Sequence, residues 1–408
     1  MNRRQFLLGL GATAVAVGSG SQYLLDEGLK NPCLSEIPDA ILQHPLYQKI
    51  WADLNPEQVW DCHAHMVGVG DTDSGIWVNP ASFSWKYPVR HIQLQFYLNA
   101  ACVADKTPID TAFTERLLHL YDVFPSGAKM MLMAFEHHYD AQGQKDLDKT
   151  TLHVPNDTVA KFAKAHPERF EWIASVHPYR ADAVDELSRC IDMGARAVKW
   201  LPPAMGMDPN SAKCDAFYQV MAKAGIPLIT HAGDEKAVHG EDLQRFASPL
   251  QLRRPLSHGV KVVVAHAASL GHNLDSDVKS GQSISNFDLF ARLMGEAGLE
   301  GTLFGEISAV TQRNRVDEGL EQLLVNTQWH SRLVNGSDYP LPGVMPLLSL
   351  TLLKRRGLLQ ADEVDFLSAL RGANVLLFDL ALKRLLKKNG QGFSAKVFES
   401  KWLFGHRA

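Results

Sequence analysis

Short runs of β-branched and other apolar residues alternate along the chain with longer stretches in which apolar residues recur every three or four positions. This alternation is typical of repeated strand–helix units around a parallel sheet. Eight apolar runs are interpreted as strands: 58–63, 128–135, 170–176, 195–201, 226–231, 261–266, 301–307 and 332–338. Eight parallel strands predict an α/β fold, a (β/α)8 barrel of the TIM type.

Four of the intervening stretches have the apolar spacing of amphipathic helices: 158–165, 182–192, 211–224 and 287–297. Gly194 and Gly225 follow two of them, where glycine commonly ends a helix. Residues 66–127 separate the first two strands by far more than a crossover needs. We therefore expect a long insertion after the first strand, above the mouth of the barrel, where insertions shape substrate pockets.

The N-terminus predicts an export signal. Arg3 and Arg4 precede an apolar run, rich in glycine and alanine, that is too short and too weakly apolar for a stable membrane span. The pattern is that of a twin-arginine signal, read by the twin-arginine export machinery. We expect a periplasmic protein that is exported folded, with an uncleaved tether to the inner membrane as the alternative. The predicted plan is a signal (1–20), an N-terminal arm (21–55), the metal-dependent barrel (56–384) and a C-terminal extension (385–408).

Composition and net charge argue against nucleic acid as a partner. The 408 residues are 46% hydrophobic and 21% charged, as in ordinary globular proteins. The formal charge of −4 lacks the basic excess that nucleic-acid binding requires, so we expect a small-molecule substrate and no nucleic acid. Assembly into a homo-oligomer is left open.

The five cysteines are scattered and odd in number, which predicts buried thiols rather than a disulfide framework or a cysteine-built zinc site.

Residues that can bind a metal occupy the ends of several predicted strands. His63 and His65 end the first run, and strand alternation places them on one side with Cα atoms about 6–7 Å apart. His231 ends the fifth run and Asp338 the eighth. Because the carboxyl ends of barrel strands form the active-site face, these imidazoles and this carboxylate predict a catalytic metal site of the zinc type.

Three more strand ends carry candidate chemistry. His266 ends the sixth run and is expected to be catalytic or a ligand, although a satisfied core histidine is the alternative. Lys199 ends the fourth run, where a buried amine needs an anionic substrate, an ion pair or a modification. Glu306 ends the seventh run and is a candidate for orienting substrate or bridging metals, but alternation leaves open which face it takes. Weaker candidates are His137, His138, His177, Arg90, Arg180 and Arg196.

Three segments resemble motifs of the amidohydrolase superfamily: 59–65 (VWDCHAH), 224–233 (AGIPLITHAG) and 335–340 (NGSDYP). The resemblance is to the branch that includes aminocarboxymuconate-semialdehyde and resorcylate decarboxylases. It implies a metal-bearing barrel that cleaves C–N, C–O or C–C bonds. Members of this branch are usually mononuclear, whereas binuclear members of the superfamily carry a carboxylated lysine where this chain has Lys199. We expect one Zn²⁺ per chain, or two divalent ions if Lys199 is carboxylated.

The expected function is that of a metal-dependent hydrolase. Metal-activated water would attack an amide, ester or lactone, with Asp338 as general base and acid and His266 polarising the carbonyl. A metal-dependent decarboxylase of a small carboxylic acid, a carbon–carbon lyase, is the alternative. An exported binding protein without turnover is a third interpretation, and it predicts a broken donor set, whereas the set here is intact.

Overall fold

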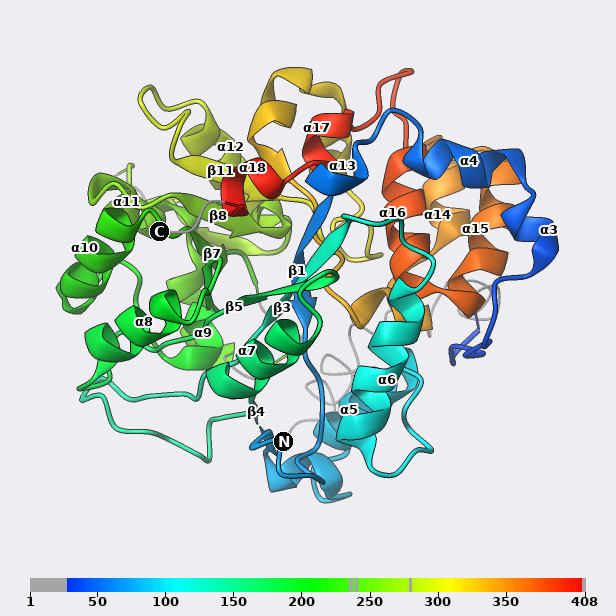
Figure 1. Cartoon of the computed structure of the whole chain (residues 1–408). Coiled ribbons are helices and arrows are strands. Elements are labelled where there is room, and N and C mark those ends of the chain that lie inside the picture. Colours follow the sequence, from blue (N-terminus) through cyan, green and yellow to red (C-terminus); the bar gives the residue numbers. More distant parts are fainter. Residues whose placement is uncertain (1–27, 235–237, 239–240, 279–280, 406–408) are drawn as a thin grey trace.

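The computed structural model describes residues 28–405 apart from 235–237, 239–240 and 279–280. Eight parallel strands form the predicted barrel, with helices around them (Figure 1). The barrel strands are β1 (Trp60–His65), β3 (Lys129–Met133), β5 (Phe170–Ile173), β6 (Val198–Trp200), β7 (Leu228–His231), β8 (Val262–Ala265), β11 (Leu303–Glu306) and β12 (Leu333–Val334). Each lies inside or overlaps one of the eight apolar runs, so the predicted fold class is confirmed.

The barrel closes through two arcs of paired strands. One arc has the order β1-β3-β5 and the other β12-β11-β8-β7-β6. Parallel bridges from Ala64 to Tyr339 and from Ala174 to Val198 join the arcs at both seams. Two short antiparallel pairs lie outside the ring: β2 (Trp77–Val78) with β4 (Leu152–His153), and β9 (His272–Leu274) with β10 (Ser283–Ser285).

The four predicted helices correspond to α7 (Asn156–Ala165), α8 (Ala183–Asp192), α10 (Asp215–Ala224) and α12 (Asn286–Met294). Gly225 caps α10 with φ +67°, a left-handed conformation that glycine adopts without steric cost. The insertion after β1 contains α5 (Pro88–Ala100) and α6 (Ile109–Tyr121). The other α-helices of the described residues are α3 (Asp39–Leu42), α4 (Pro45–Trp51), α9 (Pro202–Met205), α11 (Arg253–Ser257), α13 (Glu318–Val325), α14 (Leu350–Arg355), α15 (Ala361–Ala373), α16 (Val375–Leu385), α17 (Ala395–Phe398) and α18 (Lys401–Phe404).

The C-terminal extension completes the core. Its last helix, α18, packs against the 3₁₀ turn Pro56–Gln58 that precedes β1, and so lies at the amino end of the barrel (Figure 1). Leu403 and Phe404 are buried in one apolar cluster with inward-facing side chains of the barrel strands, among them Phe304. The extension therefore closes the end of the barrel opposite the predicted active-site face.

Cys33 and Cys102 form a disulfide, so the prediction that the chain has no disulfide framework is wrong for this pair. The two residues are 69 positions apart, and nothing local in the sequence marks them as partners. The bond links the N-terminal arm to the second residue after α5. Cys62, Cys190 and Cys214 are buried free thiols, as expected.

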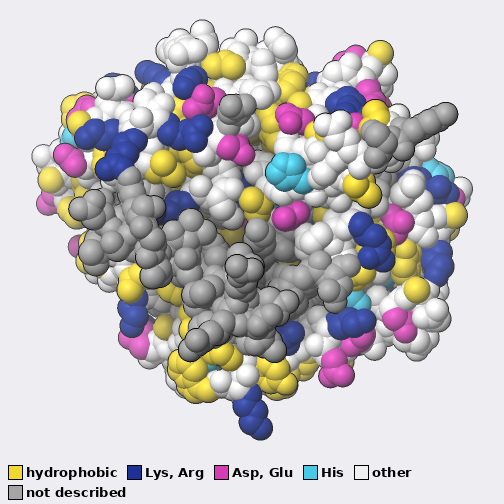
Figure 2. All heavy atoms as spheres, turned by 180° about the vertical axis from the view of Figure 1, so that it is seen from behind, with side chains coloured by type: hydrophobic (Ala, Val, Ile, Leu, Met, Phe, Trp, Pro, Cys, Tyr) yellow, Lys and Arg dark blue, Asp and Glu magenta, His cyan; other side chains and the backbone are white. Residues whose placement is uncertain are grey.

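The described surface is mixed in charge. On the face opposite to that of Figure 1, acidic and basic side chains are interspersed (Figure 2). Within the described part of the chain, none of the helices has the length and apolar character needed to span a bilayer. The predicted signal, residues 1–20, lies outside the described residues.

Candidate active site

A β-bulge in β1 aims the two histidines of the first motif. Asp61 pairs with Met130 and Ala64 with Leu132, so Cys62 and His63 together oppose one residue of β3. Cys62 packs in the apolar interior of the barrel, and His63 and His65 line a pocket at its carboxyl end. The bulge therefore lets an inward cysteine be followed directly by an inward histidine, which simple alternation forbids.

Glu306 and Ser308 determine which nitrogen of His63 is available. Nδ1 of His63 lies 3.1 Å from Oε2 of Glu306, and Ser308 donates its hydroxyl to the same carboxylate oxygen at 2.6 Å. Burial by itself raises the pKa of Glu306, but His63 and Ser308 outweigh it, so that pKa lies below its ordinary value. An ionised Glu306 accepts the Nδ1 proton of His63 and leaves the Nε2 lone pair facing the pocket.

Asp338 lies at the centre of the imidazoles. Its carboxylate is 3.1 Å from Nε2 of His65, 3.5 Å from Nε2 of His63 and 3.8 Å from Nε2 of His266. Burial raises its pKa, but these rings outweigh burial and hold the pKa well below the usual range. The residue is 4% exposed, so it is a buried carboxylate among ring nitrogens.

A left-handed backbone conformation orients the side chains of His266 and Asp338. Their φ values are +57° and +58°, a region that costs a non-glycine residue free energy and occurs at functional sites. The ring of His266 is held from behind, because its Nδ1 lies 3.1 Å from the carbonyl oxygen of Ser308 and 2.8 Å from the Ser308 hydroxyl. Since that hydroxyl already donates to Glu306, Nδ1 of His266 is the donor and Nε2 carries the lone pair.

Lys199 and His231 complete the ring of strand-end residues. Nζ of Lys199 lies 3.0 Å from Nε2 of His63, and the lysine is 1% exposed. The pKa of His63 falls to about 4, first because of burial and then because of the Lys199 charge. His231 is also buried, with its ring centroid 5.3 Å from that of His266.

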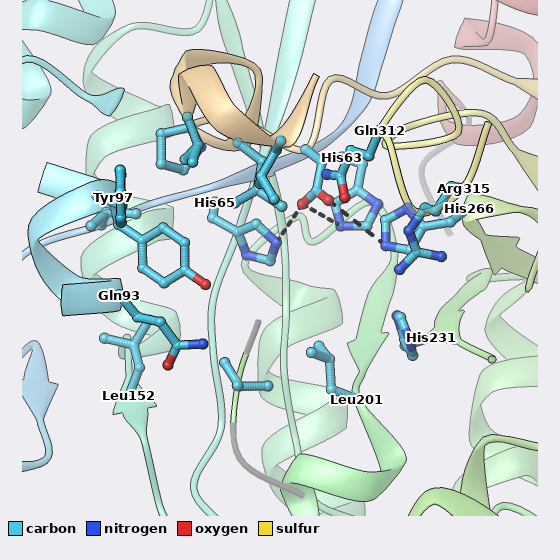
Figure 3. A pocket seen from close by; sticks show the side chains of 18 of the residues that line it. His63, His65, Gln93, Tyr97, Leu152, Leu201, His231, His266, Gln312 and Arg315 are labelled. Atoms are coloured by element: carbon cyan, nitrogen blue, oxygen red, sulfur yellow. Dashed lines mark ion pairs between the residues drawn. The ribbon is translucent and has the colours of Figure 1, made fainter. Parts of the chain in front are cut away.

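One cavity of about 170 Å³ is lined by all six of the predicted strand-end residues His63, His65, Lys199, His231, His266 and Asp338 (Figure 3). Gln93, Phe96 and Tyr97 of α5 form part of its wall, so the insertion shapes the pocket as expected. Most of the remaining wall is apolar: Val67, Phe135, Leu152, Leu201, Val238, Leu270, Pro340, Leu341, Val344, Pro346 and Leu347. The cavity suits a small molecule with a largely apolar body.

The donor set fits a divalent cation. Ligand atoms of His63, His266 and Asp338 lie within 4.8 Å of one another, all three residues are buried, and Nε2 of both rings carries its lone pair. Nε2 of His65 lies 3.1 Å from Oδ1 of Asp338, which is within hydrogen-bond distance, and His231 lines the same pocket. Imidazole nitrogen with carboxylate oxygen is the chemistry that zinc and similar ions prefer. The described residues thus contain a candidate metal site built from the predicted strand ends.

Glu306 lies behind His63 rather than on the wall of the pocket. β11 turns Phe304 and Glu306 inward together, but Glu306 contacts His63 and Ser308 and is not among the residues that line the pocket. The structure thus places Glu306 against His63, and its role in substrate binding or metal bridging stays a prediction. Two of the weaker candidates are engaged elsewhere, since Arg196 pairs with Glu171 and Arg180 with Glu136 and Asp182.

Three further residues of the site are not among the predicted site residues, although Asp61 lies within the motif at 59–65. Ser308 holds both His63 and His266. Asp61 accepts the backbone N–H groups of His63 and Ser337, and so joins β1 to the Asp338 segment; burial raises its pKa to about 6. Arg315, from the loop after β11, is 6% exposed and lines the pocket, with its guanidinium beside His266 in Figure 3.

The amidohydrolase family model matches residues 60–346, well over half of the chain. The chain belongs to the amidohydrolase family. The match covers the barrel from β1 to the loops beyond Asp338, and therefore includes every strand end that contributes a side chain to the site. No curated protein sequence matches this chain.

Solved structures of similar fold include an uncharacterized TIM-barrel protein from Bordetella bronchiseptica, with 16% identity and a TM-score of 0.45 over 70% of this chain and 88% of that chain. A 2,6-dihydroxybenzoate decarboxylase is 12% identical, with a TM-score of 0.42 over 79% of this chain and 98% of that chain. A 4-oxalomesaconate hydratase from Rhodopseudomonas palustris is 16% identical, with a TM-score of 0.40 over 80% of this chain and 98% of that chain. At these values the similarities say nothing about the reaction.

Proposed function

We propose that the protein is a metal-dependent hydrolase that attacks a C–N or C–O bond of a small, largely apolar substrate. The observation that carries the proposal is the Asp338 carboxylate, which lies within 3.1–3.8 Å of three imidazole nitrogens in a largely apolar pocket. Membership of the amidohydrolase family supports the same reaction class.

In this proposal the metal is held by Asp338 and the histidines around it: His63, His65, His231 and His266. A divalent ion in such a set, which we expect to be zinc, would lower the pKa of the attacking water molecule and polarise a carbonyl oxygen of the substrate. Asp338 accepts the proton of the attacking water and delivers it to the leaving group. His266 binds the ion rather than polarising the substrate, because its Nδ1 proton is held by Ser308 and its Nε2 has no proton to donate.

Decarboxylation of a small carboxylic acid is the second candidate, and one observation favours it. Lys199 and Arg315 are buried cations on the pocket wall, which is otherwise largely apolar. A carboxylate on an apolar body would find its counter-charges there. The same two cations would serve a hydrolase as the anchor for a carboxylated amide, ester or lactone.

An isotope experiment separates the two reactions. Purified metal-loaded protein is screened against amides, esters, lactones and aromatic carboxylates in H₂¹⁸O, with carbon dioxide measured in parallel. A hydrolase places ¹⁸O in the product acid, whereas a decarboxylase releases carbon dioxide and takes a solvent proton at carbon. Asp338→Asn is the matched inactive control. Carbon dioxide release without ¹⁸O incorporation would replace the first proposal by the second, and binding without turnover would support a non-catalytic binding protein.

Lys199 bears on the number of ions. Its amine lies 3.0 Å from Nε2 of His63, the atom that would bind the metal, so an uncarboxylated Lys199 must move toward the substrate when an ion binds. We propose one ion at this site, with Lys199 binding a substrate carboxylate. Lys199→Ala should then leave the ion content of the protein unchanged and lose activity mainly through KM. A Lys199→Ala protein that holds fewer ions than the wild type would instead show a carboxylated bridge.

We further propose export to the periplasm. The support is the Arg3-Arg4 pair before an apolar run and, independently, the Cys33–Cys102 disulfide, since disulfides persist mainly in oxidising compartments. A folded protein that takes up its metal before export is the kind of cargo that the twin-arginine route carries.

A further inference from the structure

A second group of metal-binding side chains lies apart from the site around Asp338. Glu136 and His137 follow β3, and His153 ends β4. One ligand atom from each lies within 4.8 Å of the other two. Glu136 and His137 are 4% and 6% exposed, and His153 is partly buried. We propose that these three residues bind a second divalent cation of the zinc type.

The neighbouring histidines show what a structural role looks like here. His138 directs Nδ1 to the carbonyl of Ala204 at 2.9 Å, and His177 directs Nε2 to the carbonyl of Met205 at 2.9 Å. By contrast, Nδ1 of His137 and Nδ1 of His153 are buried and have no hydrogen-bond partner among the described residues. Buried ring nitrogens are normally satisfied, so two unsatisfied ones beside a carboxylate point to a missing ligand.

Glu136 is oriented to take part. Arg180 donates to its Oε2 at 2.8 Å, and Asp182 in turn pairs with Arg180, so the arginine charge is offset. The other oxygen, Oε1, lies 3.8 Å from Nδ1 of His153. That separation is too long for a hydrogen bond. It is close to the roughly 3.3 Å between two ligands of a tetrahedral zinc with bonds of about 2.0 Å.

The two rings lie nearly parallel, with centroids 3.8 Å apart and an interplanar angle of 14°. In-plane lone pairs of parallel rings do not meet at one point. An ion held by both rings therefore requires one of them to turn about its Cβ–Cγ bond, and His153 is the more exposed of the two rings. Two rings and one carboxylate leave a fourth position for water.

The location suggests what the ion would do. Phe135 precedes Glu136 and Leu152 precedes His153, and both line the catalytic pocket. An ion bound here would cross-link the loop after β3 to β4 directly behind that wall. We expect its loss to raise KM for substrates that contact Phe135 and Leu152, while the chemistry at Asp338 continues.

The test is zinc stoichiometry, measured by mass spectrometry after equilibration with Zn²⁺ alone. His153→Asn and Glu136→Gln should each lose one equivalent relative to the wild type. His138→Asn, whose ring faces Ala204, is the matched control and should lose none. Unchanged zinc content in both His153→Asn and Glu136→Gln would overturn the second site.

A second measurement covers variants that fold poorly and separates the two sites. His63→Ala removes a ligand of the first site only, so this variant should still bind one Co²⁺ with the visible absorption of a four-coordinate site. Adding His153→Asn to it should abolish that signal while the far-UV circular dichroism of the protein is retained. A full Co²⁺ signal in the double variant would refute the assignment, whether or not the first site is catalytic.

Discussion

Replacing Glu306 with Gln tests whether the site depends on the residue behind His63. The carboxylate accepts four hydrogen bonds: from Nδ1 of His63, from the hydroxyl and the backbone N–H of Ser308, and from the backbone N–H of His266. An amide offers one acceptor oxygen and presents an NH₂ group at the other position. At least one of the four groups that now donate to Glu306 would then face the NH₂ group of the glutamine, which is itself a donor.

The expected magnitude follows from the role of His63. Without a carboxylate behind it, the ring loses the partner that keeps the proton on Nδ1 and the lone pair on Nε2. Loss of such a supporting partner typically costs about 10–100-fold in metal affinity. That corresponds to about 1.4–2.8 kcal/mol, since each tenfold change is about 1.4 kcal/mol. The fold itself should persist, because Gln has nearly the same volume as Glu.

The assay is competition for Zn²⁺ against a chromogenic chelator at equilibrium. Glu171→Gln is the matched control: this carboxylate, on β5, also has two strong partners, Lys129 at 2.7 Å and Arg196 at 2.8 Å, but it lies outside the pocket. Its loss should lower the free energy of unfolding without changing metal affinity. A Glu306→Gln protein that binds Zn²⁺ within twofold of the wild type would refute the argument.

Three further predictions address the metal, the core and export. His231→Ala should lower the zinc content of the purified protein, and full retention would remove His231 from the ligand set. Lys383→Met leaves Asp379 buried without its partner at 2.6 Å, so urea unfolding should show a loss of about 3–5 kcal/mol, largely restored when Asp379 is also made Leu; no recovery would contradict this account. Replacing Arg3 and Arg4 with Lys should leave the protein in the cytoplasm, and fractionation that still finds it in the periplasm would reject the twin-arginine route.

The strands and much of the site are readable from the chain alone, because both have local signals. A β-branched run bounded by helix-ending residues identifies a strand wherever it lies in space. In a barrel all carboxyl ends meet on one face, so a titratable residue at a strand end is placed near the others without knowledge of the contacts. His63, His65, Lys199, His231, His266 and Asp338 were found in this way, and all of them line one pocket.

Other features depend on contacts between residues that are distant in sequence. Alternation could not decide which face Glu306 takes, and the pairing of β11 inside the closed barrel decides it. Three features join segments whose local patterns show no relation to each other. They are the Cys33–Cys102 bond, the packing of α18 at the amino end of the barrel, and the Glu136–His137–His153 group. The bulge at His63 and the left-handed backbone at His266 and Asp338 belong here too, because these conformations are costly alone and persist only where the surrounding structure holds them. Local patterns thus identify which residues reach the active-site face, whereas long-range packing sets the orientation of each side chain there.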